Sequence, residues 1–354
     1  MDTLFSPLPL TSGLLRVCAA AILLAASSPV EASECKNRTR SEVLQFISSL
    51  HKSQFEKRLL SGQFIGYGDD ATFKKEIDPL SKRTGERPFL VGVDYHDYKK
   101  GGPRTAKANE LLLSYWELGG LVAISNHAGN PVTGGKAKDR PPGWSADDLL
   151  KPGSEAFKGW DRELDAVSAG LKELKKKGVV VLWRPFHEMN GGWFWWGKQK
   201  PEVFKTLWRR MHDRFQKEKL DNLIWVYSAD PDPKTVLKYY PGDGYVDIVG
   251  VDVYRSDPEN ISLETYRKLT GLGKPFAITE YGTGDPKASN HSGLSPLLDA
   301  IKAKFPKTAF FMVWYDGWAI HREPDAKAVL SDSWVAKLRD SCPPKMGSML
   351  KSPD

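Results

Sequence analysis

Cysteine is scarce in this sequence, and long apolar segments are absent after its first 32 residues. Three cysteines among 354 residues exclude a small disulfide-rich scaffold. No later run approaches the roughly 20 apolar residues that cross a bilayer. The net charge is +7, but the lysine runs fall in segments with helical periodicity, and no nucleic-acid-binding motif is present. These absences indicate a globular chain with a solvated basic surface, whose partner is not a nucleic acid.

Residues 1–32 have the composition of an export signal. Arg16 precedes the apolar run Val17–Ala26, and a segment of small residues then ends at Ala32. The apolar run is too short to span a membrane, and a buried N-terminal helix is the alternative. We therefore expect removal of residues 1–32, and a soluble mature chain that is periplasmic or secreted.

Short apolar runs alternate with helical segments along the rest of the chain. The expected strands are 63–68, 89–94, 121–125, 179–183, 223–228, 246–254, 276–280 and 309–314. The expected helices are 39–60, 105–118, 154–177, 201–219, 262–269, 294–305 and 333–339. This alternation predicts an α/β protein with a single (β/α)8 TIM barrel. An open doubly wound sheet is the alternative, but its first strand would need a Gly-rich phosphate-binding turn, which the sequence lacks.

No internal repeat or linker divides the chain after the signal. We therefore predict one catalytic domain over residues 33–345 and a C-terminal tail at 346–354. Cys35 and Cys342 stand at the two ends of this domain. The first and last elements of a closed barrel are neighbours, so a disulfide between these cysteines is plausible in an oxidising compartment. Two free buried thiols are the alternative.

The stretch 179–197, VVVLWRPFHEMNGGWFWWG, joins a buried-strand pattern to a charged and aromatic segment. Arg184, His187 and Glu188 are costly to bury unless they meet partners or water at the end of the strand. Three tryptophans and a phenylalanine follow within four residues. The apolar C–H faces of a pyranose pack against indole rings. The stretch therefore predicts a sugar-binding site at one end of the barrel.

Chemistry-bearing residues also follow other expected strands. The residues at the strand ends are His96, His127, Glu188, Tyr254, Glu280 and Trp314. In barrels of this kind the carboxyl ends of the strands carry the chemistry. Period-two alternation groups Arg184, Phe186 and Glu188; Phe276, Ile278 and Glu280; and Asp252 with Tyr254. We expect the apolar members to point inward and both glutamates to lie over the barrel mouth.

Two carboxyl groups across one cleft are what glycoside hydrolysis requires. One protonates the leaving oxygen, and the other attacks the anomeric carbon when the pair is about 5–5.5 Å apart. A structural salt bridge is the alternative for Glu280. It is a weaker alternative for Glu188, because a purely structural charge gains little from aromatic surroundings.

The segment RPFHEMNGGWFWWG at 184–197 resembles the signature of glycoside hydrolase family 26, a family of β-mannanases. The resemblance extends to ITEYG at 278–282, VDIVGVDVY at 246–254 and, more loosely, GGLVAISNHAGNP at 119–131, and so covers essentially the whole mature chain. The family belongs to a clan of barrels with the acid/base on strand four and the nucleophile on strand seven. Most of the clan has Asn before the acid, whereas family 26 has His, as at His187.

The resemblance implies a role for each matching residue. Glu188 would be the general acid/base and Glu280 the nucleophile, with His187 orienting the pair and contacting the sugar. The other implied roles are Tyr254 as hydrogen-bond donor to the nucleophile, Trp314 as floor under the cleaved sugar, Trp193 as lining of the leaving-group side, His127 as contact to the next sugar on the non-reducing side, and Arg184 as counter-ion of Glu280.

Each of the supporting assignments has a plainer alternative. His127 could be a hydrogen-bonded core histidine, and Arg184 could form an ion pair elsewhere. Packing behind the site is at least as good an interpretation as sugar contact for Trp183, Trp195 and Trp196. The resemblance implies no cofactor and no metal, and a monomer acting on a β-linked plant polysaccharide such as mannan, galactomannan or glucomannan.

Two residues depart from the family pattern. Asn126 stands where a Trp commonly precedes the strand-three histidine, and Tyr315 replaces a basic residue after the strand-eight Trp. Both changes concern sugar subsites, so mixed-linkage β-1,3-1,4-glucan and β-1,3-xylan are alternative substrates within the family.

A zinc enzyme is disfavoured because position 191 of the HEMNG motif is Gly instead of His. A non-catalytic sugar-binding barrel would normally have lost one of the two carboxylates.

Overall fold

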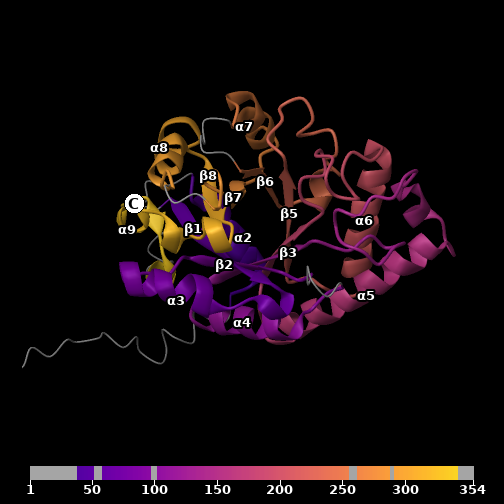
Figure 1. Cartoon of the computed structure of the whole chain (residues 1–354), viewed down its shortest axis with the longest axis horizontal. Helices are drawn as coiled ribbons and strands as arrows, with labels where there is room; N and C mark the ends of the chain where they lie inside the picture. The colour runs from indigo at the N-terminus through magenta and orange to yellow at the C-terminus, as the bar shows by residue number, and fades with distance from the viewer. Residues whose placement is uncertain (1–37, 52–57, 97–101, 255–260, 288–290, 342–354) are drawn as a thin grey trace, which may run out of the picture.

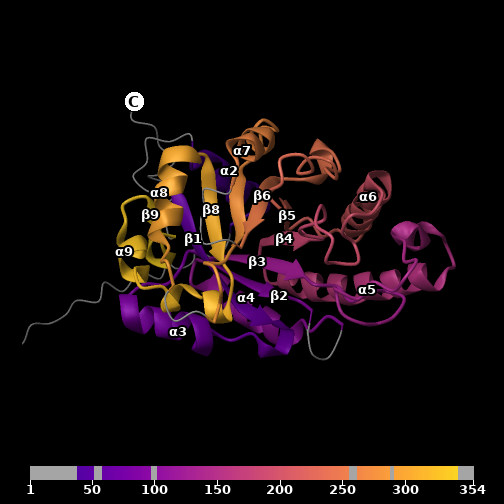
Figure 2. The same cartoon turned by 45° about the horizontal axis from the view of Figure 1, so that its top comes forward.

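Eight parallel strands form a closed barrel at the centre of the molecule (Figures 1 and 2). The computed structural model describes residues 38–51, 58–96, 102–254, 261–287 and 291–341. The barrel strands are β1 (Leu59–Tyr67), β2 (Leu90–Asp94), β3 (Leu121–Asn126), β4 (Val181–Pro185), β5 (Leu223–Ala229), β6 (Ile248–Val253), β7 (Phe276–Tyr281) and β8 (Thr308–Val313). Neighbours in the chain pair in parallel, and β1 pairs with both β2 and β8, which closes the barrel. The predicted TIM barrel is confirmed.

Helices surround the barrel, with α3 and α4 along one side and α5 and α6 along another in both views (Figures 1 and 2). The helices are α2 (Arg40–Ser49), α3 (Phe73–Thr84), α4 (Ala106–Glu117), α5 (Glu155–Lys176), α6 (Pro201–Lys217), α7 (Leu263–Thr270), α8 (Ser295–Lys304) and α9 (Ala326–Ser331). Several begin at a side chain that caps a free backbone N–H, such as Ser154 before α5 and Ser262 before α7. Within the described ranges, no helix combines the length and apolar composition of a bilayer crossing.

Helix α2 covers the amino-terminal end of the barrel. Arg38, just before the helix, donates to the carbonyl of Gly120, the residue that precedes β3. Arg40 donates to the carbonyl of Leu223 at the start of β5 and pairs with Asp247 at 2.6 Å. With this end occupied, the carboxyl ends of the strands remain for a site.

Large side chains from β1 and β8 fill the barrel interior. A Cβ at Gly62 would lie 2.2 Å from Sδ of Met312, and one at Gly92 would lie 2.6 Å from the ring of Phe64. Both positions therefore require glycine, because Phe64 and Met312 take up the space. The guanidinium of Arg184 stands 5.6 Å from the Phe64 ring, so this packed layer forms the floor beneath the strand-four charge.

The helix predictions fail at three places. The expected helix 39–60 is wrong at its end, since α2 stops at Ser49 and β1 begins at Leu59. The expected helix 333–339 is wrong: Val335–Ala336 forms the short strand β9 beside β1, and a 3-10 turn follows at Leu338–Asp340. Helix α3 was not anticipated. Its apolar residues have helical spacing, but Pro79 inside it reads as a helix breaker.

Several sequence predictions concern residues outside the described ranges. These are the signal at 1–32, the Cys35–Cys342 disulfide and the tail at 346–354. They stay predictions.

Candidate active site

A cleft of about 600 Å³ opens at the carboxyl ends of the strands. The predicted residues that line it are His127, His187, Glu188, Trp193, Tyr254, Glu280 and Trp314. Further lining residues that the sequence did not single out for a role include Tyr67, Lys138, Phe194, Asp230, Asp252 and Trp318. Arg184 lies buried just beneath, with 3% of its surface exposed. His96 does not line the cleft, and its Nε2 accepts from the backbone of Gly102 at 3.1 Å.

The backbone after β4 turns twice into the left-handed region. Phe186 has φ of 50° and Glu188 has φ of 53°, both uncommon for residues with a side chain. As a result Phe186 packs on Trp160 of α5 and Phe204 of α6, with ring centroids at 5.2 and 5.7 Å. Glu188 instead lines the cleft, and its backbone N–H is held by the carbonyl of Ser228 at 2.9 Å. The predicted grouping of Phe186 with Glu188 is therefore wrong.

Strand β7 carries a register shift beside its glutamate. Ile278 pairs with Val251 of β6, but Glu280 pairs with Asp252, so Thr279 is an extra residue between the two pairs. Phe276 consequently faces Tyr266 of α7, with ring centroids 5.1 Å apart, while Glu280 lines the cleft. The strict alternation expected for this strand is wrong, although the predicted position of Glu280 at the mouth is confirmed.

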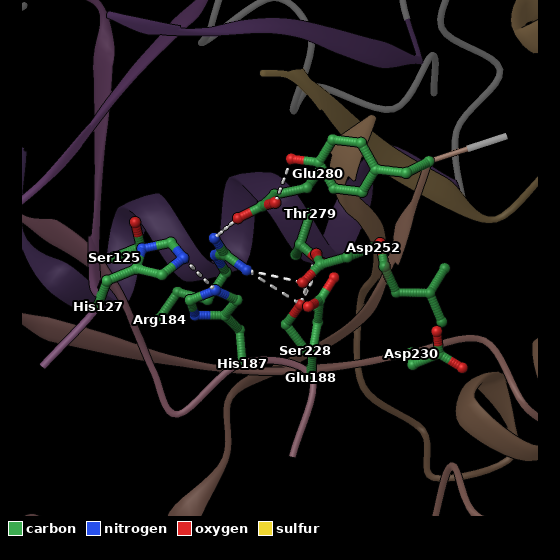
Figure 3. Close-up of polar contacts among 12 residues, drawn as sticks. Ser125, His127, Arg184, His187, Glu188, Ser228, Asp230, Asp252, Thr279 and Glu280 are labelled. Carbon is green, nitrogen blue, oxygen red and sulfur yellow. Dashed lines mark hydrogen bonds and ion pairs between the residues drawn. The ribbon is translucent and has the colours of Figure 1, made fainter. Parts of the chain in front are cut away.

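Arg184 connects two carboxylates at the bottom of the cleft (Figure 3). Its Nη1 lies 2.9 Å from Oδ2 of Asp252, and its Nη2 forms a close ion pair with Oε1 of Glu280. The hydroxyl of Tyr254 donates to the other oxygen of Glu280 at 2.5 Å. Both oxygens of Glu280 therefore have a partner, which fixes the carboxylate in place and favours its charged form.

Asp252 is a site residue that the sequence reasoning missed. Besides Arg184, it accepts hydrogen bonds from the hydroxyls of Ser228 and Thr279 at 2.7 and 2.8 Å (Figure 3). Its side chain is fully buried. The predicted grouping with Tyr254 on β6 was a signal for it, but its link to Arg184, 68 positions earlier, appears only in the closed barrel.

Glu188 and Glu280 face each other at short range. One carboxylate oxygen of each, together with one of Asp252, lie within 4.8 Å of one another. Burial, followed by the charges of Asp252 and Glu280, raises the pKa of Glu188 well above its usual range. Burial also raises the pKa of Glu280, but the guanidinium of Arg184 opposes that rise. Glu188 is therefore the more readily protonated carboxyl group of the pair, and Glu280, beside Arg184, is the more readily ionised one.

The same three carboxyl groups have the donor set of a cation site. Arg184, however, already occupies one oxygen of Asp252 and one of Glu280. The positive charge that such a cluster needs is thus supplied by the chain itself. The arrangement fits acid–base chemistry at Glu188 better than coordination of an ion.

Two histidines form one wall of the cleft. Nδ1 of His127 lies 2.7 Å from Oδ2 of Asp94, which also accepts from Ser125 at 2.6 Å. Against the effect of burial, these partners lower the pKa of Asp94 to about 2, so Nδ1 of His127 is the donor. His187 Nε2 lies 3.1 Å from His127 Nε2, and burial followed by the charge of Arg184 lowers the pKa of His187 well below its usual range. His187 is therefore neutral at pH 7.

Three of the tryptophans support the site from behind. Trp183, Trp195 and Trp196 are at most 1% exposed and do not line the cleft, so the packing interpretation is confirmed. Trp196 donates its Nε1–H to the carbonyl of His187 at 2.8 Å. Trp195 donates likewise to the carbonyl of Ala128, next to His127. Both indoles thus hold the backbone of the histidine wall.

Three other tryptophans, Trp193, Trp314 and Trp318, line the cleft itself. Trp193 is 40% exposed and donates from Nε1 to Oε2 of Glu188 at 2.5 Å. Trp314, which directly follows β8, packs against Phe64 and Tyr67 with ring centroids at 4.5 and 5.9 Å. The cleft therefore combines the largely buried indole of Trp314 with the exposed indole of Trp193, and Trp318 adds a third.

A closed parallel barrel with two facing carboxyl groups in an aromatic cleft has the equipment of a glycoside hydrolase. The model of Glycosyl hydrolase family 26 matches residues 32–340, and the chain belongs to this family. The resemblance read from the strand-four and strand-seven motifs is confirmed.

Relatives with established names are similar over most of the chain. A mannan endo-1,4-beta-mannosidase of Bacillus subtilis strain 168 is 37% identical over 317 residues, which cover 84% of this chain and 85% of the relative. The mannan endo-1,4-beta-mannosidase A and B of Caldalkalibacillus mannanilyticus is 36% identical over 314 residues, but the match spans 60% of that longer protein. A solved Bacillus subtilis mannanase structure is 34% identical with a TM-score of 0.77, covering 86% of this chain and 94% of the other.

Proposed function

We propose that the protein is a retaining endo-β-1,4-mannanase that cleaves mannan, galactomannan or glucomannan by double displacement. The observation that carries this proposal is a pair of carboxyl groups with oxygens within 4.8 Å, of which Glu188 has a raised pKa and Glu280 is paired with Arg184. The names of the relatives support β-mannan as the substrate class.

In the first step, the ionised Glu280 attacks the anomeric carbon of the sugar above it. The bond from that carbon to the glycosidic oxygen breaks, and the protonated Glu188 gives its proton to the departing oxygen. The product is a covalent glycosyl ester on Glu280. Tyr254 and Arg184 hold Glu280 in position for this attack.

In the second step, Glu188 is a carboxylate and acts as base. It takes a proton from a water molecule, whose oxygen attacks the anomeric carbon and displaces Glu280. Two inversions leave the anomeric configuration unchanged. The proton returns to Glu188, and the site is reset.

The other cleft residues bind and orient the sugars. We assign Trp314 to the floor under the cleaved sugar and Trp193 to the leaving-group side, where it also holds Glu188. His187, neutral and buried, orients the pair, and His127 contacts the next sugar toward the non-reducing end. These roles follow the family resemblance and fit the positions around the cleft.

The two departures from the family pattern have different consequences. Asn126 is 5% exposed and donates to Glu163 at 3.1 Å, and it does not line the cleft. Tyr315 does line it, beside Tyr67 at 5.4 Å between ring centroids. A phenol in place of a cation changes which sugar hydroxyls this wall accepts, so mixed-linkage β-1,3-1,4-glucan and β-1,3-xylan remain the alternative substrates.

A substrate panel distinguishes these alternatives. We expect release of reducing ends from linear mannan, galactomannan and glucomannan, with little from mixed-linkage β-glucan or β-1,3-xylan. A preference for either of the last two polymers would contradict the mannanase assignment while leaving the family intact. Short oligosaccharides as first products would support endo action.

Replacing Arg184 with Met should shift the acid side of the pH–activity profile. Glu280 must be ionised to attack, so activity is lost as pH falls through its pKa. Without the guanidinium that pKa rises further, and the acid limb of kcat/KM should move up by about 1–3 pH units. The profile measured on soluble oligosaccharide checks this.

Arg214→Met is the matched control, because Arg214 pairs with Asp165 and Glu218 on the helical surface. It should leave the profile unchanged. An unshifted acid limb in Arg184→Met would contradict the ion pair as the cause of the ionisation of Glu280.

We also propose that the enzyme acts as a monomer outside the cytoplasm. The support for action outside the cytoplasm is the export-signal composition of residues 1–32 and the polymeric substrate, and the monomer follows from the family resemblance. N-terminal sequencing of the exported protein should find a start near residue 33.

A further inference from the structure

Asp230 is a cleft residue to which the proposed reaction assigns no step. It directly follows β5 and lines the same cleft as Glu188. The side-chain amide of Asn190 forms two hydrogen bonds with the backbone of Asp230. It accepts from the Asp230 N–H and donates to the Asp230 carbonyl, each at 2.8 Å. Since Asn190 is two residues from Glu188, Asp230 is held at a fixed place relative to the acid/base.

The position of Asp230 points to the leaving-group side. Figure 3 shows Asp230 and His127 on opposite sides of the network formed by Arg184, Asp252 and Glu280. The acid must stand next to the oxygen that it protonates, and Trp193, which we assign to the leaving-group side, donates a hydrogen bond to Glu188. Asp230, which follows the neighbouring strand β5, lines the cleft together with Trp193 and Glu188.

A half-buried carboxylate and an indole, as in Asp230 and Trp193, line the same cleft and can hold a sugar together. The indole supports the apolar ring face, while the two carboxylate oxygens accept hydrogen bonds from adjacent hydroxyls. We propose that Asp230 binds hydroxyl groups of the sugar on the leaving-group side and so determines how well that sugar is held. This inference rests on the proposed function of the same cleft.

The leaving-group side is used twice in a retaining reaction. It holds the departing sugar in the first step, and in the second step it can hold a sugar that replaces water as the acceptor. The carboxylate of Asp230, if it binds the sugar on this side, should therefore affect both the cleavage of polymers and the transfer of sugar to acceptors. It should have little effect on a substrate whose leaving group carries no hydroxyls.

The test compares two substrates for Asp230→Asn and Asp230→Ala. Loss of a hydrogen bond to a charged group should reduce kcat/KM on mannopentaose by about 10- to 100-fold. With an aryl β-mannobioside, whose phenol leaves without filling the sugar site, the loss should be at least fivefold smaller. The ratio of transfer to hydrolysis products should fall as well.

Asp232→Asn is the matched control from the same loop. Its carboxylate caps the turn by binding the Lys234 N–H at 3.0 Å and the Thr235 hydroxyl at 2.8 Å, and it does not line the cleft. Equal losses on both substrates in the Asp230 variants, an unchanged kcat/KM on mannopentaose, or the same substrate-selective loss in Asp232→Asn would each overturn the inference. Failure of the wild-type enzyme on all mannans would instead overturn the proposed function.

Discussion

Replacing Glu280 with Ala should abolish hydrolysis of β-mannan while leaving oligosaccharide binding largely intact. The nucleophile forms the bond that defines the first step, and loss of such a group in other enzymes costs on the order of 10⁶ in kcat. Arg184 keeps its pairing with Asp252 in the variant, so the buried guanidinium is not left without a counter-ion. Reducing-end assays and calorimetric titration with mannopentaose measure the two properties separately.

Glu264→Ala is a suitable control for Glu280→Ala. Glu264 lies on the neighbouring helix α7 and is exposed, paired with Lys268. Its removal should change neither property. Activity that survives in Glu280→Ala, with the carboxylate gone, would show that the nucleophile is misassigned.

Replacing Glu188 with Ala should lower kcat/KM on mannan by about 10²- to 10⁴-fold, the contribution of a general acid. The loss should shrink for a mannoside whose leaving group departs without a proton, such as a dinitrophenolate. With that substrate the slow step becomes removal of sugar from Glu280, because no base activates water. Azide, which needs no base, should then accelerate turnover and give a glycosyl azide of retained configuration.

The exposed Glu202 on α6, paired with Lys205, is the matched control for Glu188. Glu202→Ala should behave as wild type with and without azide. An equal loss of Glu188→Ala activity on both kinds of leaving group would contradict its role as proton donor. An azide product of inverted configuration would contradict the order of the two carboxyl groups.

The sequence predicted the barrel because buried parallel strands are short apolar runs that helices separate. Polar residues at the ends of those runs, such as Glu188 and Glu280, were then expected at one mouth, since parallel strands share a direction. The cleft brings both together with His127 and His187. This part of the site depends only on the order of the strands, and the apolar runs in the sequence show that order.

What the sequence did not predict depends on backbone geometry and closure. The left-handed turns at Phe186 and Glu188 and the register shift at Thr279 reverse the alternation of side chains. None of these three residues is a glycine, which would have indicated an unusual backbone conformation. The link from Arg184 to Asp252 likewise exists only because the ends of β4 and β6 converge on the barrel axis.

The most direct test of the central claim is to trap the covalent intermediate. A 2-deoxy-2-fluoro-β-mannoside with an activated leaving group slows the second step and should leave the sugar bound to the enzyme. We expect peptide mass spectrometry to find one fluorosugar per chain, on the peptide of β7 and at Glu280. Slow turnover without any label, or a label on another carboxylate such as Glu188 or Asp252, would contradict the account.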